Sequence, residues 1–97
     1  MLNKSQILSI LRENYEELSK KFKVKRIGLF GSIVKNSETK DSDIDILVDF
    51  FEPITIFTFI DLEDFLSLKL DRKVDLVSEK GLKQVLKNNI LKEVVYV

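Results

Sequence analysis

Apolar residues recur every three or four positions near the start of the chain, which predicts an amphipathic helix over residues 3 to 21. Asn3 is placed to cap the N-terminus of this helix, with Gln6 three residues further on. The stripe that would face a core consists of Ile7, Leu11, Tyr15 or Asn14, Leu18 and Phe22.

The spacing then changes to that of strands. Residues 24 to 30 alternate and are rich in branched side chains, which predicts a strand that ends at Gly31 and Ser32. A short helical turn is expected over residues 32 to 37, and the polar residues 36 to 42 are expected to form a loop. Residues 43 to 48 have a period of two, which indicates a second strand.

The segment from residue 54 to residue 70 fits two interpretations, because ITIFTFI favours a strand by residue type while apolar side chains recur as on a helix. The length of the segment decides for a helix, with Pro53 near its first turn. The helical positions are Phe59, Leu62, Leu66 and Leu70.

Two further elements complete the pattern. Residues 73 to 77 predict a third strand, and Ser78 with Glu79 would begin a last helix carrying apolar residues as far as Val94. The order of elements indicates an α/β (α+β) fold with a small mixed sheet of about three strands packed with helices. The first two strands are joined by roughly a dozen residues, too few for a crossover helix, so they are expected to pair antiparallel.

The composition is that of an ordinary globular protein, with 97 residues, 44% of them hydrophobic and 33% charged. This length predicts a single domain over residues 1–97. No apolar run approaches the ~20 residues that cross a bilayer. Charges interrupt the first residues too often for a signal peptide, so a cytoplasmic location is expected.

The charge balance and the absence of two residue types limit the partners and the kinds of site that the chain can have. The 16 basic residues are balanced by 16 acidic ones, so the broad positive field of a duplex-binding protein is absent and a nucleic-acid partner is disfavoured. The chain has no Cys and no His, which excludes disulfides, thiolate or imidazole zinc sites and a Ser-His-Asp triad. Any metal must be a hard cation held by oxygen, and any general base a carboxylate, Lys, Tyr or the metal itself.

Three aspartates are the candidate catalytic and metal-binding residues. Asp43 and Asp45 lie two apart on the second strand, so their carboxylates project from the same face while Ile44 points into the core. Asp75 interrupts the apolar third strand and would join them if the two strands are neighbours. Such a group suits two-metal nucleotidyl transfer. A solvated strand end for the first two, and an edge-strand position for Asp75, are the alternatives.

Gly31 and Ser32 follow the first strand and open a helical turn. Backbone N–H groups there can face an anion, because glycine permits close approach and the serine hydroxyl adds a donor. An ordinary turn is the alternative, since Gly-Ser often forms one. The P-loop pattern is absent from the sequence.

Taken together, these segments resemble the DNA polymerase β-like nucleotidyltransferase superfamily, and in particular its minimal, stand-alone branch. They are LFGS at residues 29–32, DIDILVDF at residues 43–50 after a spacer of ten residues, and KVDLV at residues 73–77. ILKE at residues 90–93 also fits this branch, so the resemblance covers nearly the whole chain.

The resemblance implies a magnesium-dependent transfer of a nucleotide. Gly31 and Ser32 would bind the triphosphate, while Asp43 and Asp45 would ligate the Mg²⁺ ions, two being expected. Asp75 would complete the metal site and deprotonate the attacking hydroxyl. The donor expected from the resemblance is ATP or another nucleoside triphosphate.

A protein partner is also implied. The minimal branch is similar to the antitoxin half of two-gene modules whose toxin is a HEPN-domain (higher eukaryotes and prokaryotes nucleotide-binding) ribonuclease. The chain is therefore expected to transfer AMP to a hydroxyl of such a toxin, while a membrane partner is not expected and a homo-oligomer is left open. The alternative function is a catalytically weak module that neutralises the toxin by binding it. An RNA or small-molecule acceptor is a third hypothesis, disfavoured by the neutral charge and the lack of a second domain.

The sequence departs from the family pattern directly after Ser32. Residues 33–36 read IVKN, where the family commonly has Arg-Ala-Arg-Gly. Lys35 keeps the positive charge but lacks a guanidinium fork, and Asn36 is expected to replace glycine in a left-handed turn. Nucleotide affinity and choice are the properties that these changes would affect.

Overall fold

The computed structural model describes residues 2–36 and 42–97. Within these residues a four-stranded sheet is packed with helices, as the α+β fold class predicts. The elements are α1 (Lys4–Glu13), α2 (Tyr15–Phe22), β1 (Val24–Phe30), the 3-10 helix η1 (Gly31–Ile33), β2 (Ile44–Phe50), α3 (Ile56–Leu70), β3 (Val74–Ser78), the 3-10 helix η2 (Glu79–Gly81), α4 (Gln84–Glu93) and β4 (Val95–Tyr96).

The strands lie in the order β3-β2-β1-β4. β1 and β2 are antiparallel, as the short connection between them predicts, and β3 lies beside β2 in a parallel pair that α3 connects. β4 pairs antiparallel with the other edge of β1 through Gly28 and Leu29. The prediction of about three strands missed β4, because two residues are too few to show a period of two.

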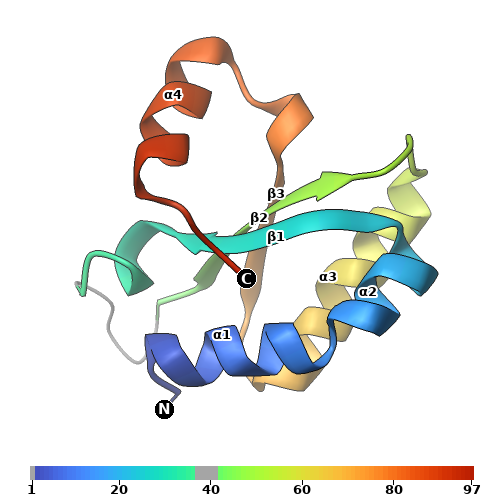
Figure 1. The fold of residues 1–97 in the computed structure, drawn as a ribbon, viewed down its shortest axis with the longest axis horizontal. Helices are drawn as coiled ribbons and strands as arrows, with labels where there is room; N and C mark the ends of the chain where they lie inside the picture. The colour runs from blue at the N-terminus through green and yellow to red at the C-terminus, as the bar shows by residue number, and fades with distance from the viewer. Residues whose placement is uncertain (1, 37–41) are drawn as a thin grey trace.

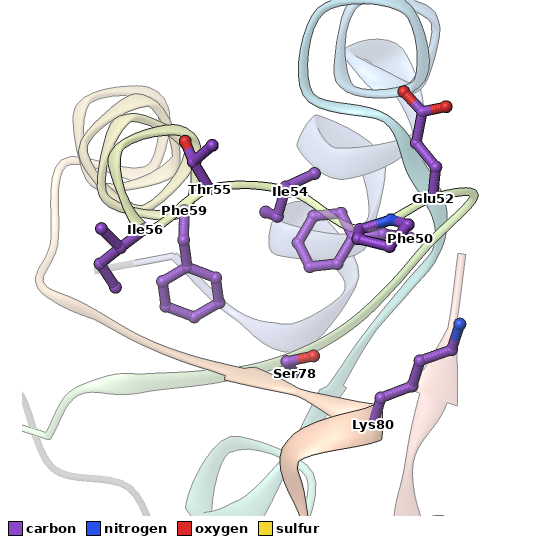
Figure 2. A pocket seen from close by; sticks show the side chains of 9 residues that line it. Phe50, Glu52, Ile54, Thr55, Ile56, Phe59, Ser78 and Lys80 are labelled. Carbon is purple, nitrogen blue, oxygen red and sulfur yellow. The ribbon is translucent and has the colours of Figure 1, made fainter.

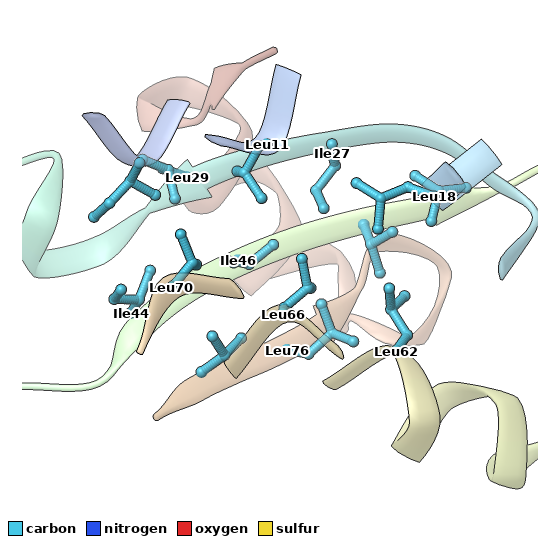
Figure 3. Close-up of a cluster of buried hydrophobic side chains, with 14 of the residues drawn as sticks. Leu11, Leu18, Ile27, Leu29, Ile44, Ile46, Leu62, Leu66, Leu70 and Leu76 are labelled. Carbon is cyan, nitrogen blue, oxygen red and sulfur yellow. The ribbon is translucent and has the colours of Figure 1, made fainter. Parts of the chain in front are cut away.

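One face of the sheet carries the hydrophobic core. Figure 1 shows α1, α2 and α3 on this side of the sheet and α4 on the other. Ile44, Ile46 and Val48 of β2 are fully buried in this core, as their alternation predicts. Figure 3 shows how leucines of the helices meet the branched side chains of the strands, which removes apolar surface from water.

The first predicted helix is two helices. Its start is as expected, since the Asn3 side chain accepts a hydrogen bond from the Gln6 N–H at 2.8 Å and Gln6 returns the contact to the Asn3 N–H at 2.9 Å. The helix is interrupted at Asn14, whose side-chain amide donates to the Ile10 carbonyl at 2.7 Å. The prediction of one continuous helix was wrong: Asn14 has a φ of −99° and a ψ of 5°, outside the helical range, and its side chain and its backbone N–H both donate to the Ile10 carbonyl.

Two other helix starts differ from the prediction. α3 begins at Ile56 because Thr55 caps it, accepting from the Thr58 N–H at 3.3 Å, so Pro53 lies before the helix. The last helix begins at Gln84 and not at Ser78 or Glu79. Before it, β3 continues through Ser78 and η2 follows. The expected loop over residues 36–42, and the end of the turn over residues 32–37, lie largely outside the described residues.

α4 lies on the second face of the sheet with much of its apolar surface exposed, Val85 at 74% and Leu86 at 53%. In the described part of the chain, no helix combines the length and the apolar character needed to cross a membrane.

Candidate active site at one end of the sheet

The candidate residues gather where β1 ends and where β2 and β3 begin. Phe30, the last residue of β1, is the antiparallel partner of Asp45, and Asp45 is the parallel partner of Asp75. Paired residues in neighbouring strands project from the same face of a sheet. The bend at Gly31 therefore lies beside two carboxylates from two different strands, as the sequence predicted.

The carboxyl groups of Asp45 and Asp75 are in direct contact. Burial raises the pKa of Asp45 above its ordinary value, and the negative charge of Asp75 raises it further. A hydrogen bond from the Ser32 N–H lowers the pKa of Asp45, while the charge of Asp43 and, least of all, a hydrogen bond with the Asp75 carboxyl group add smaller upward shifts. Two acidic groups held this close disfavour the state in which both are charged, and a cation placed between them would remove that cost.

Asp43 lies just before β2 and is half-buried. One of its carboxylate oxygens lies 3.9 Å from the Nζ of Lys73, the residue that precedes β3. The Lys73 carbonyl accepts the Ile44 N–H at 3.0 Å, and Arg72 donates to the carbonyl of Ser42. One backbone hydrogen bond and one hydrogen bond from the Arg72 side chain thus hold the starts of β2 and β3 together. Over residues 2–36 and 42–97, no three acidic side chains are already gathered closely enough to form a metal site.

The bend after β1 requires glycine. Gly31 has a φ of +74°, in the left-handed region, and a Cβ at this position would collide with the Asp45 carboxylate. The Gly31 carbonyl accepts the N–H groups of Val34 and Lys35, both at 3.1 Å, which closes the turn. Asn36 ends it with a φ of 56°, as predicted for a residue that replaces glycine there.

Glu93, the last residue of α4, also reaches this bend. Its Oε1 accepts the Gly31 N–H at 3.2 Å, and its Oε2 lies 3.2 Å from the Nζ of Lys35. The sequence did not predict this contact, because it depends on the pairing of β4 with β1. The only sequence signal was the position of Glu93 inside the ILKE segment at residues 90–93.

A second polar group lies on the same face of the sheet, further from the carboxylate pair. Arg26 donates to both carboxylate oxygens of Glu79, at 3.1 and 3.0 Å, and its guanidinium lies 4.8 Å from the centre of the Tyr96 ring. Asp49 is the register partner of Arg26 and only 9% exposed. Burial raises the pKa of Tyr96, and the charge of Glu79 raises it further. This group joins η2 and β4 to the sheet.

A hollow lined mainly by apolar residues lies elsewhere in the described residues. It has a volume of about 370 Å³, and Figure 2 shows Phe50, Ile54 and Phe59 around it at the junction of β2 and α3. Phe50 is at the opposite end of β2 from Asp45, roughly 16 Å away along the strand. This hollow is therefore separate from the carboxylate pair.

A mixed sheet that brings strand-borne carboxylates next to a glycine–serine bend defines an enzyme that handles nucleotide phosphates. Comparison with known proteins agrees with this class. The family model described as a nucleotidyltransferase domain matches residues 10–97. The chain therefore belongs to the nucleotidyltransferase family, in its minimal branch.

Individual relatives are similar over nearly the whole chain. The protein adenylyltransferase MntA of Thermococcus cleftensis is 45% identical over 97 residues, which are 100% of this chain and 98% of that protein. A toxin–antitoxin structure with AMP-PNP matches at a TM-score of 0.72 and 29% identity, over 98% of this chain and 72% of that one. A tri-AMPylated HEPN toxin of Shewanella oneidensis in complex with its MNT antitoxin matches at 0.62 and 28%, over 97% and 67%. The resemblance stated from the sequence is confirmed.

Proposed function

We propose that this chain transfers AMP from ATP to a hydroxyl group of a HEPN-domain partner protein, with release of pyrophosphate. The observation that carries the proposal is the contact between the Asp45 and Asp75 carboxyl groups beside the Gly31–Ser32 bend. Acidic side chains on neighbouring strands, next to backbone N–H groups that can bind an anion, are what nucleotidyl transfer requires.

Asp43, Asp45 and Asp75 are the residues proposed to hold Mg²⁺. Their donors are all carboxylate oxygens, the ligands that this hard cation prefers. The raised pKa of Asp45 fits this role, because it reflects a negative charge for which the chain itself supplies too little compensation. When bound, Mg²⁺ would supply charge neutralisation at the phosphates. Asp43 would have to exchange its 3.9 Å contact with Lys73 for the metal.

Gly31 and Ser32 are proposed to bind the triphosphate. The bend carries backbone N–H groups and a hydroxyl at the end of β1, and the missing side chain of Gly31 lets the Asp45 carboxylate lie directly against it. Lys35 extends from the same turn with 63% of its side chain exposed, and its ammonium, which lies 3.2 Å from Glu93, would contact a phosphate once that ion pair opens.

The proposed reaction is a single displacement at the α-phosphorus. The hydroxyl oxygen of the acceptor forms a bond to that phosphorus as the bond to the bridging oxygen breaks, and pyrophosphate leaves. Asp75 is exposed and would accept the proton that the hydroxyl loses. Holding the two reactants in line accounts for much of the rate of such transfers.

The relatives support the donor and the acceptor. The T. cleftensis protein is named an adenylyltransferase that acts on protein, and one toxin–antitoxin structure contains AMP-PNP. The S. oneidensis structure contains a HEPN toxin that carries AMP groups. These are properties of those proteins, and the 45% identity over the whole chain is the reason to propose them here.

The test is to incubate this chain and a HEPN partner with Mg²⁺ and ATP labelled in the α-phosphate. We expect label on the partner, identified by mass spectrometry as AMP on a hydroxyl side chain. Asp45→Asn and Asp75→Asn should each lose the labelling. Asp61→Asn, which removes an exposed charge from α3, should retain it. A stable complex without label would support the alternative, a module that acts by binding alone.

A further inference from the structure

Glu93 binds two groups that the proposed function assigns to the triphosphate, the Gly31 N–H and the Lys35 ammonium. Its carboxylate accepts the Gly31 N–H at 3.2 Å and lies 3.2 Å from the ammonium of Lys35. An amide N–H and an ammonium around one anion are also the groups that bind a phosphate oxygen. The anion-binding groups of the bend are therefore already occupied by a carboxylate of the protein itself, that of Glu93.

The backbone directs Glu93 to this position. β4 pairs antiparallel with β1 through Val95 opposite Leu29, and continuing this register by two residues places Glu93 opposite Gly31. Glu93 also ends α4, so helix and strand both fix its backbone. With only 25% of its side chain exposed, Glu93 is enclosed more than a surface ion pair would be.

The second amide of the bend, the N–H of Ser32, also donates to a carboxylate of the chain. The N–H of Ser32 donates to the carboxylate of Asp45, which is a proposed metal ligand. Both amides of the glycine–serine bend thus donate to carboxylates of the chain. Asp45 can turn toward a cation and remain in the site, whereas Glu93 comes from the opposite side of the bend and has no assigned role.

We infer that Glu93 is an internal competitor of the triphosphate, which occupies the Gly31 amide and Lys35 until a nucleotide displaces it. This inference rests on the proposed function, because it takes the bend as the phosphate site. The carboxylate and a phosphate cannot share one N–H, and their like charges repel at this distance. Glu93 therefore lowers affinity for the triphosphate and keeps Lys35 from binding other anions.

The test measures binding, without any acceptor protein. Isothermal titration with ATP, and with inorganic tripolyphosphate to probe the phosphate site alone, is carried out on the wild type and on Glu93→Gln. Glutamine keeps an oxygen that can accept the Gly31 N–H but carries no charge. We expect Glu93→Gln to bind both probes about tenfold more tightly. Asp61→Asn is the matched control, since it removes one negative charge from the opposite face of the sheet and should leave both affinities unchanged.

A second measurement follows Lys35. In the wild type Lys35 is shared with Glu93, so Lys35→Met should weaken ATP binding less in the wild type than in Glu93→Gln. The amide resonance of Gly31 should move on addition of tripolyphosphate, because its hydrogen-bond acceptor changes.

The outcomes separate the two proposals. Equal or weaker binding of both probes by Glu93→Gln, with the wild type binding ATP, overturns the competitor role, because Glu93 would then only support the bend. The proposed function would stand in that case. Failure of the wild type and of Glu93→Gln to bind ATP and tripolyphosphate overturns both.

Discussion

Asp45 of β2 and Asp75 of β3 are direct partners in a parallel ladder, and their carboxyl groups share a hydrogen bond. Acidic residues are uncommon in strands, and two of them side by side oppose each other electrostatically. The pair therefore lowers the stability of the sheet at the position where the proposed chemistry takes place. This loss of stability can be measured.

The first prediction concerns stability and pH in the absence of metal. The pKa of Asp45 is raised in the folded state, so the folded protein binds this proton more tightly than the unfolded chain does. The contribution of this protonation to the free energy of unfolding is fully present below the pKa of about 4 that Asp45 has in the unfolded chain. It is lost as pH rises through the pKa of Asp45 in the folded protein. Urea unfolding should therefore show that Asp45→Asn is more stable than the wild type at neutral pH, with the difference shrinking toward about pH 4. A difference that does not vary with pH would contradict this account.

The second prediction concerns metal and nucleotide. Mg²⁺ with ATP should raise the Tm of the wild type, because a ligand at 100 times its Kd adds about 2.7 kcal/mol to the free energy of unfolding. Asp45→Asn should abolish this gain by removing a proposed ligand. Asp61→Asn should keep the full gain, and differential scanning fluorimetry is sufficient to compare the three proteins. The absence of any magnesium-dependent shift in the wild type would argue against the metal site.

The third prediction concerns the pair formed by Arg26 and Glu79. The Glu79 side chain is 9% exposed, and Arg26 donates a hydrogen bond to each of its two carboxylate oxygens. Arg26→Met should lower the free energy of unfolding by about 2 kcal/mol, because it leaves a buried carboxylate unpaired. Adding Glu79→Gln should recover part of this loss.

The same substitution has an optical readout. Arg26 lowers the pKa of Tyr96, against the stronger effects of burial and of Glu79. Arg26→Met should therefore move the alkaline titration of Tyr96 to still higher pH, as followed by ultraviolet absorbance in a Tyr15→Phe background. An unchanged tyrosine titration would show that the guanidinium does not lie over the ring.

The fourth prediction compares two glycines. A Cβ on Gly28 would lie 2.7 Å from the carbonyl oxygen of Val95, so Gly28→Ala should push β4 away from β1 and cost about 1–3 kcal/mol. The N–H of Val97, which donates to Ile27 at 3.0 Å, should then exchange faster with deuterium. Gly81→Ala is the matched control, because its nearest neighbour would be 4.0 Å away, and it should change stability by less than about 1 kcal/mol.

Much of this architecture could be predicted from local patterns. The bounds of β1, the antiparallel pairing of β1 with β2, the meeting of Asp45 with Asp75 and the left-handed Asn36 follow from residue period, connection length and backbone preference. Each of these depends on residues close in sequence or on a single strand pairing. The roles of Asp43, Asp45 and Asp75 in metal binding stay predictions.

What could not be predicted depends on contacts between distant segments. β4 is two residues long and is recognisable only once β1 offers it a free edge. The contact of Glu93 with Gly31 follows from that pairing, so it was missed with it. The interruption at Asn14 involves a hydrogen bond from its side chain to the Ile10 carbonyl, and periodicity carries no information about such a contact. The late start of α4 follows from β3, which continues through Ser78, and from η2 after it, where the Ser78 side chain makes no capping hydrogen bond.

The parallel pairing of β2 with β3 is made by α3, which returns the chain from one end of the sheet to the other. Two acids from separate strands are neighbours only while that helix stays docked through Leu62, Leu66 and Leu70. Replacing Leu66 with a smaller residue would weaken the packing of α3 and separate the two carboxylates, although neither acidic residue is changed. Catalytic activity in this small protein therefore depends on the packing of its helices, and a substitution that disturbs this packing would lower the activity.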